Sequence, residues 1–479
     1  MANIDDAKKF FTDTDNIAQG LLIAQFIFDP NETTQEGIEA FLANPEAKLS
    51  TAGGCYTLKY WRDDFYTWAE GCWKKISDSE LQRIVVAHLQ KLNETADCEQ
   101  KINIGTYKVR DIILCLKGTV GVTESVEANT WVDGREKIFY TLSLRNGLLL
   151  LDKRQKDRPS LQPHTPKFFN LTKLSYDYDA KAECPAFQDF LFDIFQENTE
   201  YCNLIMQWCG YLLRPDLNEQ KFMLFVGEGA NGKSVLSDVI IALVGAANCS
   251  HLPLNRFGDK FSLNAMVGKL LNTSIESSSI IEEEAETLLK SVVAGDLLTI
   301  DRKFKESIEV KPTAKILIAT NALPRFNDHS QGTWRRLLLV PFDKVIPESE
   351  QKKNLVDMLK KELSGILNFA IAGLNSLNTN GGFTIPKDMK EQVEQYHRDS
   401  DPARCFLFEN YQADPNSKIR CSEIYKTYTA YCIENGYKSM NVRTFGQQVK
   451  RCFQQVERIR PGSGNSRDWF YQGITSQAS

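Results

Sequence analysis

The chain has 479 residues, of which 42% are hydrophobic and 25% are charged, and its formal net charge is −5 at pH 7. This length suggests about three domains, and the composition excludes a disordered or fibrous chain. The acidic balance excludes nucleic-acid binding as a property of the whole chain, so any such site must be a local cluster of Lys and Arg.

The sequence lacks clear signals for secretion, membrane insertion or metal binding. The first residues, MANIDDAKKFF, lack the basic start and apolar run of a secretory signal. No stretch approaches the roughly 20 apolar residues that a membrane span requires. We therefore expect no membrane partner and a cytoplasmic location, which is the host cytoplasm if the gene is viral or phage-encoded. The 12 Cys form no C-x-x-C pair, so we expect reduced thiols and no zinc site.

The segment up to residue 184 mixes strand and helix patterns. Alternation in YWRDDFYTW (60–68), followed by Gly71, predicts a β-hairpin. The SDSEL motif then predicts a helix that Ser77 or Asp78 caps. Further along, Asn146-Gly147 marks a turn within a strand-rich stretch.

Three tryptophans in this segment, Trp61, Trp68 and Trp73, allow two interpretations. Their rings could stack on the bases of a single strand. Aromatic residues at strand spacing more often lie in a core, and we favour that interpretation.

From Pro185 the pattern changes. Residues 187–213 have helical apolar spacing that ends near Gly210, with Pro215 beyond. KFMLFVG then predicts a buried strand and SVLSDVIIALVG the helix after it. Apolar strands alternate with helices as far as residues 341–342, which predicts an α/β sheet. The polar stretch 375–388 is expected to be a connector.

A complete phosphate-binding pattern, GEGANGKS, lies between that strand and helix. Glycines allow backbone N–H groups to curl around phosphate oxygens at a helix N-terminus, Lys233 would neutralise the β- and γ-phosphates, and Ser234 would hold Mg²⁺. We therefore expect ATP with Mg²⁺. The expected nucleotide contacts are Gly227, Glu228, Gly229, Ala230, Asn231, Gly232, Lys233, Ser234 and Val235. The loop alone does not give the class of nucleotide enzyme.

Downstream residues narrow the class. Glu276 ends the apolar run in GKLLNTSIE, where a carboxylate would assist Mg²⁺ and polarise the attacking water. Asn321 ends KILIATN, where an amide would hold the water or the γ-phosphate. Arg335 and Arg336 precede the strand LLLVPF, and a solvated basic pair is the alternative there.

Taken in this order, residues 185–345 resemble the superfamily 3 helicases of the AAA+ class, most closely the poxvirus and phage/plasmid primase–helicase family. The resemblance rests on QKFMLFVGEGANGKS, LNRFGDKFSLNAMVGKLLN, GDLLTIDRKFK and TNALPRFNDHSQGTWRRLLLVPF. It implies a Walker A motif at 227–234, a Walker B motif ending at Glu276, a sensor at Asn321 and an arginine finger at Arg336 or Arg335. Such a finger acts across a subunit interface, so the resemblance implies a ring, expected to be a hexamer.

One departure concerns Walker B. Many members of the superfamily carry two adjacent acidic residues there, whereas Ile275 precedes and Ser277 follows Glu276. Either Glu276 serves both Mg²⁺ and the water, or Mg²⁺ relies on Ser234 and solvent.

Two basic regions are candidates for DNA contact. In the resembled family, a hairpin before the sensor strand projects into the central channel, and here it would carry Lys303, Phe304 and Lys305 beside Arg302. The C-terminal segment, with helical patterns at 422–432 and 442–453 and an aromatic strand ending at Tyr471, looks like a winged-helix domain. Its basic residues are Arg443, Lys450, Arg451, Arg458, Arg460 and Arg467, with 460–467 as the expected wing. For both regions the alternative is that the charged side chains are merely exposed to solvent, on a segment that only packs against the rest of the fold.

These features predict an α/β chain with an AAA+ P-loop core. The expected domains are an α+β accessory or collar domain at 1–184, an AAA+ helicase domain at 185–385, and a linker with a winged-helix-like domain at 386–479. No primase signature is present in the first domain. The expected function is that of a replicative DNA helicase of a virus, phage, plasmid or mobile element. It would move along single-stranded or forked DNA as a ring and interact with replication proteins. The alternatives are an origin-remodelling ATPase with little unwinding and a nucleotide-switched DNA-binding scaffold.

Overall fold

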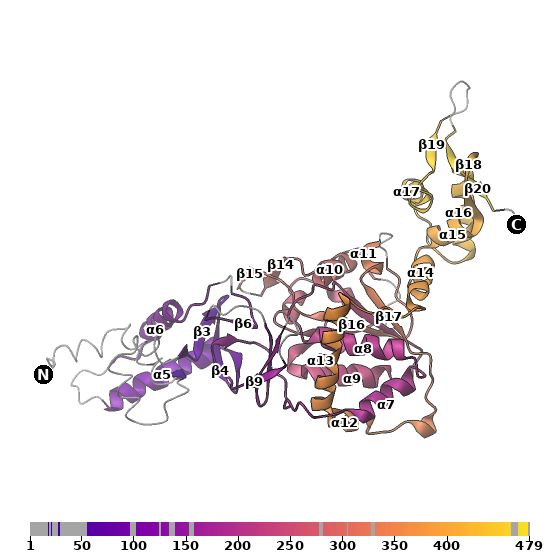
Figure 1. Ribbon diagram of the computed structural model, residues 1–479. Helices are drawn as coiled ribbons and strands as arrows, with labels where there is room; N and C mark the ends of the chain where they lie inside the picture. Colours follow the sequence, from indigo (N-terminus) through magenta and orange to yellow (C-terminus); the bar gives the residue numbers. More distant parts are fainter. Residues whose placement is uncertain are drawn as a thin grey trace.

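The structure is a computed structural model in which three parts of the chain follow one another (Figure 1). It describes residues 18, 21, 27–28, 55–95, 102–123, 126–133, 139–152, 158–276, 281–303, 305–326, 331–460 and 468–477. None of the helices among these residues has the length and apolar character that a membrane span requires.

The first part contains a three-stranded antiparallel meander followed by two helices. Strands β3 (Leu58–Trp61), β4 (Asp64–Ala69) and β5 (Cys72–Ile76) pair in sequence order, which confirms the predicted hairpin. Ser77 accepts a hydrogen bond from the Glu80 backbone N–H at 3.2 Å and so caps the next helix, as predicted. The two helices are α5 (Asp78–Thr95) and α6 (Thr106–Thr119).

Short strands complete this part. They are β1 (Ile27–Phe28), β2 (Cys55–Tyr56), β6 (Thr130–Trp131), β7 (Phe139–Leu144), β8 (Gly147–Asp152), β9 (Ser160–Gln162) and β10 (Phe168–Phe169). The register pairs Leu144 with Gly147, so the predicted turn is present with Arg145 and Asn146 as its two loop residues. Trp61 and Trp73 are almost completely buried, and both rings pack against Phe169. The core interpretation is therefore confirmed for these two tryptophans.

A five-stranded parallel sheet forms the centre of the second part, in the order β12–β13–β16–β11–β17. Its strands are β11 (Phe222–Val226), β12 (Cys249–Ser250), β13 (Leu271–Glu276), β16 (Lys315–Thr320) and β17 (Leu337–Pro341). Strands β11, β16 and β17 are nearly continuous apolar runs because helices cover both faces of a parallel sheet, whereas β13 carries several polar residues. This confirms the predicted mixed α/β fold with a parallel sheet.

The helices around this sheet are α7 (Pro185–Ile194), α8 (Thr199–Leu212), α9 (Lys233–Val244), α10 (Glu283–Ala294), α11 (Gln331–Trp334), α12 (Leu355–Lys360) and α13 (Leu363–Asn380), and α14 (Met389–Ser400) leads away from it. Short 3₁₀ turns occupy Ala246–Asn248, Leu254–Arg256, Ser262–Met266 and Glu348–Glu350. Between α10 and β16 an antiparallel hairpin, β14 (Leu298–Arg302) with β15 (Lys305–Val310), projects toward the first part (Figure 1).

Two sequence predictions in this part were wrong. The helical pattern at 187–213 is broken between α7 and α8, where Gln196 and Glu197 adopt positive φ angles of 51° and 63°. The helix also continues through Gly210, because that glycine does not end the helix but allows α13 to pack closely against it. A Cβ atom added at Gly210 would lie 2.3 Å from the Leu374 backbone N of α13.

The second wrong prediction is the start of the polar connector. Residues 375–380 belong to α13, and the helix ends where Gly381 adopts a left-handed φ of 67°. Only the part of the connector from Gly381 onward is non-helical before α14.

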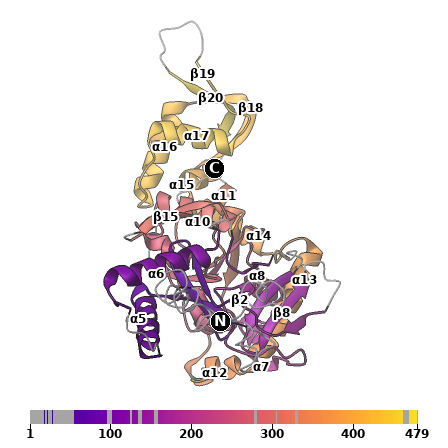
Figure 2. The same cartoon turned by 90° about the vertical axis from the view of Figure 1, so that its left-hand side faces the viewer.

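The third part is a small α+β unit with its own core (Figure 2). Its elements are α15 (Pro402–Asn410), β18 (Tyr411–Arg420), α16 (Cys421–Glu434), α17 (Val442–Cys452), β19 (Glu457–Ile459) and β20 (Phe470–Ser476), with β20 central in a three-stranded antiparallel sheet. The Tyr428 and Phe445 rings stack at 4.4 Å between the two longer helices. The aromatic strand continues past Tyr471, where the sequence pattern had placed its end.

Candidate nucleotide-binding site

The glycine loop follows β11 at the carboxyl edge of the parallel sheet and leads directly into α9. Three of its residues have positive φ angles, Gly229 at 119°, Ala230 at 48° and Gly232 at 84°. This sequence of left-handed residues turns the chain tightly enough to form a cradle of backbone N–H groups. Asn231 fixes the back of the loop, because its side-chain N–H donates to the Phe342 carbonyl at 3.0 Å.

Two of the glycines also have no room for a side chain. A Cβ atom on Gly227 would lie 2.2 Å from the Asn231 amide nitrogen, and one on Gly232 would lie 2.7 Å from the side chain of Ile194 in α7. Packing therefore favours glycine at both positions, and the left-handed φ of Gly232 favours it there as well.

The Lys233 ammonium lies at the centre of the site. It donates hydrogen bonds to the Gly227 carbonyl at 2.6 Å, the Thr320 carbonyl at 2.7 Å and the side-chain oxygen of Asn321 at 2.9 Å. Burial lowers the pKa of this ammonium from its usual value. The structure thus brings together two predicted site residues, Lys233 and Asn321, from different segments of the chain.

Glu276 ends β13 at the same edge of the sheet, since it pairs in register with Thr320 of β16. Its side chain lies outside the described residues. Ser234 and Glu228 are exposed on the open side of the loop, and Val235 is partly buried. The sheet therefore brings the backbones of all the predicted cis-acting residues to one edge, as parallel topology requires.

A cavity of about 1010 Å³ opens beside the loop, large enough for a nucleoside triphosphate. Besides Gly229–Val235 and Asn321, α7 and residues 346–359 line it; in α12 the lining side chains are Leu355, Met358 and Leu359. A second cavity of about 480 Å³ adjoins Lys233, Ser234 and Asn321, and extends to Asp238, His251 and Thr273. Asp238 was not predicted as a site residue, although it follows Ser234 by one helical turn on α9.

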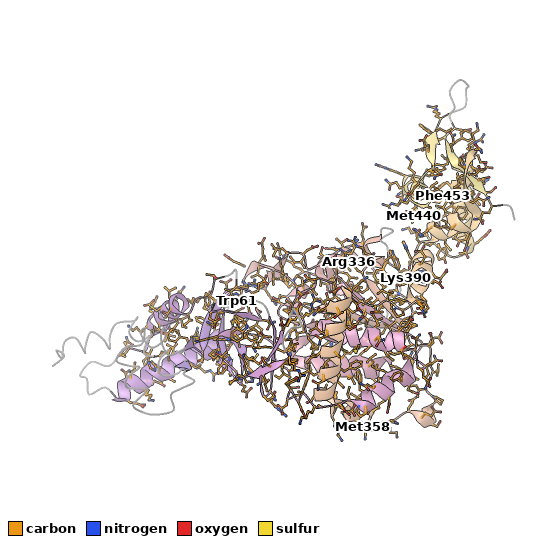
Figure 3. The ribbon with its side chains drawn as sticks, viewed as in Figure 1. Trp61, Arg336, Met358, Lys390, Met440 and Phe453 are labelled. Atoms are coloured by element: carbon orange, nitrogen blue, oxygen red, sulfur yellow. The ribbon has the colours of Figure 1, made fainter. Side chains whose placement is uncertain are left out.

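Arg335 and Arg336 lie at the opposite end of the sheet. They precede β17, whose first residue, Leu337, pairs with Phe222, whereas the glycine loop follows the other end of β11. The four residue steps from Phe222 to Val226 separate the two ends of β11 by about 13 Å. Figure 3 labels Arg336 on one side of the core and Met358, which lines the larger cavity, on the other. The structure therefore does not bring either arginine to the loop of its own chain.

These arginines form a cationic cluster with Lys221, which the sequence analysis missed. Lys221 donates a hydrogen bond from its ammonium to the Arg335 carbonyl at 2.5 Å. Burial, together with the charges of Arg335 and Arg336, lowers the pKa of Lys221, while Glu219 opposes the shift. Burial and the neighbouring Arg335 likewise lower the pKa of Arg336, against the opposing effect of Asp296. The Arg336 Nε atom is buried without a hydrogen-bond partner among the described residues. A cluster of this kind suits an anion supplied from outside the chain.

The predicted DNA-contact residues of the hairpin are divided by the structure. Lys303 is exposed at the turn between β14 and β15, and Phe304 lies outside the described residues. Arg302 and Lys305 instead face the turn between β3 and β4, where Lys305 pairs with Asp64 and Arg302 with Asp63 at 2.8 Å. The hairpin is thus joined to the first part of the chain.

In the C-terminal part the predicted basic residues lie on two elements. Arg443 and Lys450 are exposed on α17, and Arg451 follows them there. Arg458 and Arg460 belong to or follow β19, and their guanidinium groups lie 4.6 and 5.9 Å from the ring of Trp469. Arg467 lies outside the described residues.

Two family models match the chain. Residues 225–336 match a family described as of unknown function (DUF5906), and residues 401–478 match the RFX DNA-binding domain. The first match begins in β11 and ends at Arg336, so it includes the glycine loop and the two arginines of the cationic cluster, but not Lys221.

Viral proteins are among the relatives. The candidate helicase 022R of Frog virus 3 (isolate Goorha) is 25% identical over 265 residues, covering 50% of this chain and 27% of its own length. The candidate helicase L207/L206 of Acanthamoeba polyphaga mimivirus is 29% identical over 164 residues, which are 33% of this chain and 17% of the relative. The candidate helicase 121R of Invertebrate iridescent virus 3 is 22% identical over 357 residues, which are 67% of this chain and 37% of the relative.

Among solved structures, the apo C-terminal region of NrS-1 superposes with a TM-score of 0.48 at 13% identity, over 87% of this chain and 96% of that one. The chain thus spans well under half the length of the three viral relatives. By sequence, it is related to helicase-like proteins of large DNA viruses.

Proposed function

We propose that the chain is the motor of an ATP-dependent DNA helicase of the superfamily 3, AAA+ type. The observation that carries this proposal is the hydrogen bond between Lys233 and Asn321 at the carboxyl edge of the central strands. It joins a phosphate-binding lysine to an amide on the neighbouring strand, next to a cavity of nucleotide size. A strand, glycine loop and helix with an amide such as Asn321 beside them are suited to hydrolysing ATP as well as binding it.

In this proposal ATP enters the larger cavity with its phosphates on the loop. The Lys233 ammonium gives up hydrogen bonds to its present protein acceptors and donates to β- and γ-phosphate oxygens instead. The Asn321 side chain then holds the attacking water. Ser234, Glu276 and the neighbouring Asp238 are oxygen donors of the type that Mg²⁺ prefers, so the donor set fits that ion. Bound Mg²⁺ would offset the negative charge that develops on the phosphates.

The position of the cationic cluster supports a site that is shared between two chains. Arg335, Arg336 and Lys221 are about 13 Å along the sheet from the loop of their own chain, beyond the reach of one side chain. A second copy placed head to tail would bring the cluster to the neighbour's γ-phosphate, and repetition of that contact closes a ring. We propose a ring, expected to be a hexamer, with Arg336 or Arg335 as the finger and Lys221 beside it.

DNA contact is proposed at two places. The C-terminal part would act as a winged-helix-like domain, which its match to the RFX DNA-binding domain supports. Arg443 and Lys450 on α17 and Arg460 beside Trp469 supply its positive charge. Lys303 at the hairpin turn would contact single-stranded or forked DNA in the ring channel.

The domain limits proposed here are 1–184, 185–385 and 386–479, with the first as an accessory or collar domain. Given its relatives, the chain is proposed to serve replication of a virus or related mobile element, together with other replication proteins.

A second candidate function is remodelling of a DNA site with little unwinding. The match to a DNA-binding domain favours it, because such a domain can hold the motor at one position. A nucleotide-switched scaffold would differ from both in lacking steady-state turnover.

The test combines two assays on the purified chain. ATP hydrolysis is measured with and without single-stranded DNA, and unwinding is measured on a forked duplex, with Lys233→Ala as the inactive control. DNA-stimulated hydrolysis with unwinding supports the helicase. DNA-stimulated ATP hydrolysis without unwinding favours the remodelling ATPase. Binding of ATP and DNA without ATP hydrolysis would refute both the helicase and the remodelling ATPase.

A further inference from the structure

The tip of the β14–β15 hairpin is bound to a turn 240 residues earlier in the chain. The Arg302 guanidinium donates to the Asp63 carboxylate and to the Arg62 carbonyl, both at 2.8 Å. The Lys305 ammonium donates to the Asp63 carbonyl at 2.9 Å and to the Asp64 carboxylate. Figure 1 shows the hairpin reaching over the first part of the chain at this point.

The backbone of this turn has a conformation that non-glycine residues seldom adopt. Arg62 and Asp63 both adopt left-handed conformations, with φ angles of 50° and 61°, and they join β3 to β4 as a two-residue hairpin turn. Non-glycine residues adopt that conformation at an energetic cost. The turn presents two carbonyls and two carboxylates to the hairpin, and we name Arg62–Asp64 the acidic turn.

The hairpin cations that face the acidic turn are the kind that bind phosphate. The Arg302 side chain is only 8% exposed, and all of its nitrogen groups lie near acceptors, including the Glu306 carbonyl at 2.9 Å. Carboxylates and phosphates compete for the same N–H donors with similar geometry. A nucleic-acid backbone at this hairpin therefore has to replace Asp63 and Asp64.

We propose that the acidic turn is an autoinhibitory latch: it occupies Arg302 and Lys305 with carboxylates until the phosphates of single-stranded nucleic acid displace it. This inference rests on the proposed function, because it assumes that the hairpin contacts nucleic acid. Displacement frees the hairpin to move with the ATPase cycle while the first part of the chain remains in place.

The acidic turn can open without leaving a buried, uncompensated charge. The Asp63 side chain is 50% exposed, so water replaces Arg302 there. Asp64 is almost buried, but it keeps a second ion pair with Lys75 at 2.8 Å, within the meander itself. Burial alone would raise the pKa of the Asp64 carboxyl, yet the hydrogen bonds from Lys305 and Lys75 hold it below its usual value. Breaking a buried pair is costly mainly when one partner loses all compensation, which Lys75 prevents here.

The first experiment uses the unmodified chain. A zero-length carbodiimide reagent joins adjacent carboxylates and amines, and mass spectrometry of peptides then measures the amide between Asp64 and Lys305. The latch predicts that saturating oligo-dT lowers this product severalfold, while the product between Glu70 and Lys74, paired at 2.8 Å in the same meander, is unchanged. An Asp64–Lys305 product that saturating oligo-dT leaves at its original yield would overturn the latch.

The second experiment measures oligo-dT affinity by fluorescence anisotropy for Asp63→Asn. In the proposed latch the closed form dominates without nucleic acid, so removing one carboxylate should raise the affinity on the order of tenfold. Glu70→Gln is the matched control, since it removes the same charge from an exposed carboxylate at the other turn of the meander.

The outcomes separate the latch from the proposed function. Equal or weaker binding by Asp63→Asn shows that the acidic turn does not compete with nucleic acid, which refutes the latch while leaving the helicase intact. Absence of oligo-dT binding in every variant, including the wild type, refutes the proposed hairpin contact itself.

Discussion

The Lys233 ammonium and the Asn321 side-chain oxygen are 2.9 Å apart and hydrogen-bonded, although 88 residues separate them in the chain. Lys233 starts α9 and Asn321 follows β16, so the bond links the glycine loop to the strand beside it. An amide held in this way is positioned before any nucleotide arrives, which reduces the reorganisation that the reaction requires.

This relationship predicts different defects for its two partners. Lys233→Ala removes the charge that the phosphates need, so nucleotide affinity should fall by roughly 10²-fold or more. Asn321→Ala should retain nucleotide affinity within severalfold but lower the hydrolysis rate by roughly 10²- to 10³-fold. Binding of a fluorescent ATP analogue and steady-state phosphate release distinguish the two.

Asn416→Ala, an exposed amide in β18, is the control and should behave as wild type. If Asn321→Ala loses nucleotide affinity to the same degree as Lys233→Ala, Asn321 has a structural rather than a hydrolytic role.

The cationic cluster predicts complementation between inactive variants. Arg336→Ala should bind ATP normally and hydrolyse it at least roughly 10³-fold more slowly, by analogy with other trans-acting arginines. Mixing it with Lys233→Ala should restore activity, because some interfaces then combine an intact loop from one chain with an intact arginine from its neighbour.

Arg256→Ala serves as the control for loss of an arginine, since Arg256 is exposed and pairs with Asp259, three residues along the chain, at 2.8 Å. Failure of every mixture to regain hydrolysis would mean that the site is complete within one chain. Normal hydrolysis by Arg336→Ala alone would instead leave Arg335 or Lys221 to be tested in its place.

The glycine loop and its strand and helix were predictable because each depends on neighbouring residues. The break at Gln196 and Glu197 was not, since neither residue type signals a left-handed backbone. Gly210 looked like a helix end, yet its role depends on α13, which comes 160 residues later.

Separation along the chain also made some residues of the site impossible to predict. Lys221 precedes a strand with nothing local to distinguish it, and only the parallel pairing of β11 with β17 places it beside Arg335 and Arg336. The partners of Arg302 and Lys305 are some 240 residues away, and nothing local in the DRKFK motif could indicate them.

The two proposed DNA-contact regions predict separate salt effects. Lys303→Ala should weaken oligo-dT binding and reduce the slope of log K against log salt by about 0.7, the value for one phosphate on a single strand. Basal ATP hydrolysis should not change, but its stimulation by oligo-dT should fall.

Arg460→Ala should leave oligo-dT stimulation intact and instead weaken binding to a duplex, with a slope change near 0.9. These values come from titrations at several salt concentrations. If Arg460→Ala and Lys303→Ala lower oligo-dT and duplex binding in parallel, the two regions form one continuous surface rather than two.

The buried Lys315 predicts a stability change in the alkaline range. This residue begins β16 and is 1% exposed, with its ammonium donating to the carbonyls of Arg214 and Thr313. Burial lowers its pKa to about 7, against the opposing effect of Asp216. In the unfolded chain the same group titrates near 10.4.

The direction in which the free energy of unfolding changes with pH follows from the number of protons that each state binds. Between pH 7 and about 10 the unfolded chain holds a proton on Lys315 that the folded chain does not hold, so the free energy of unfolding rises with pH across this window. Below pH 7 both states are protonated and the contribution becomes constant. The total rise from this one group is on the order of several kcal/mol.

Urea unfolding at several pH values between 7 and 10 should therefore give a smaller slope for Lys315→Met than for the wild type. Lys390→Met, on the exposed face of α14, should keep the wild-type slope, because its ammonium is hydrated in both states. Cysteines and tyrosines titrate in the same window in all three proteins, so their contribution cancels in the comparison. Equal slopes for Lys315→Met and the wild type would mean that Lys315 remains protonated in the folded chain, stabilised there by the two carbonyls and by Asp216.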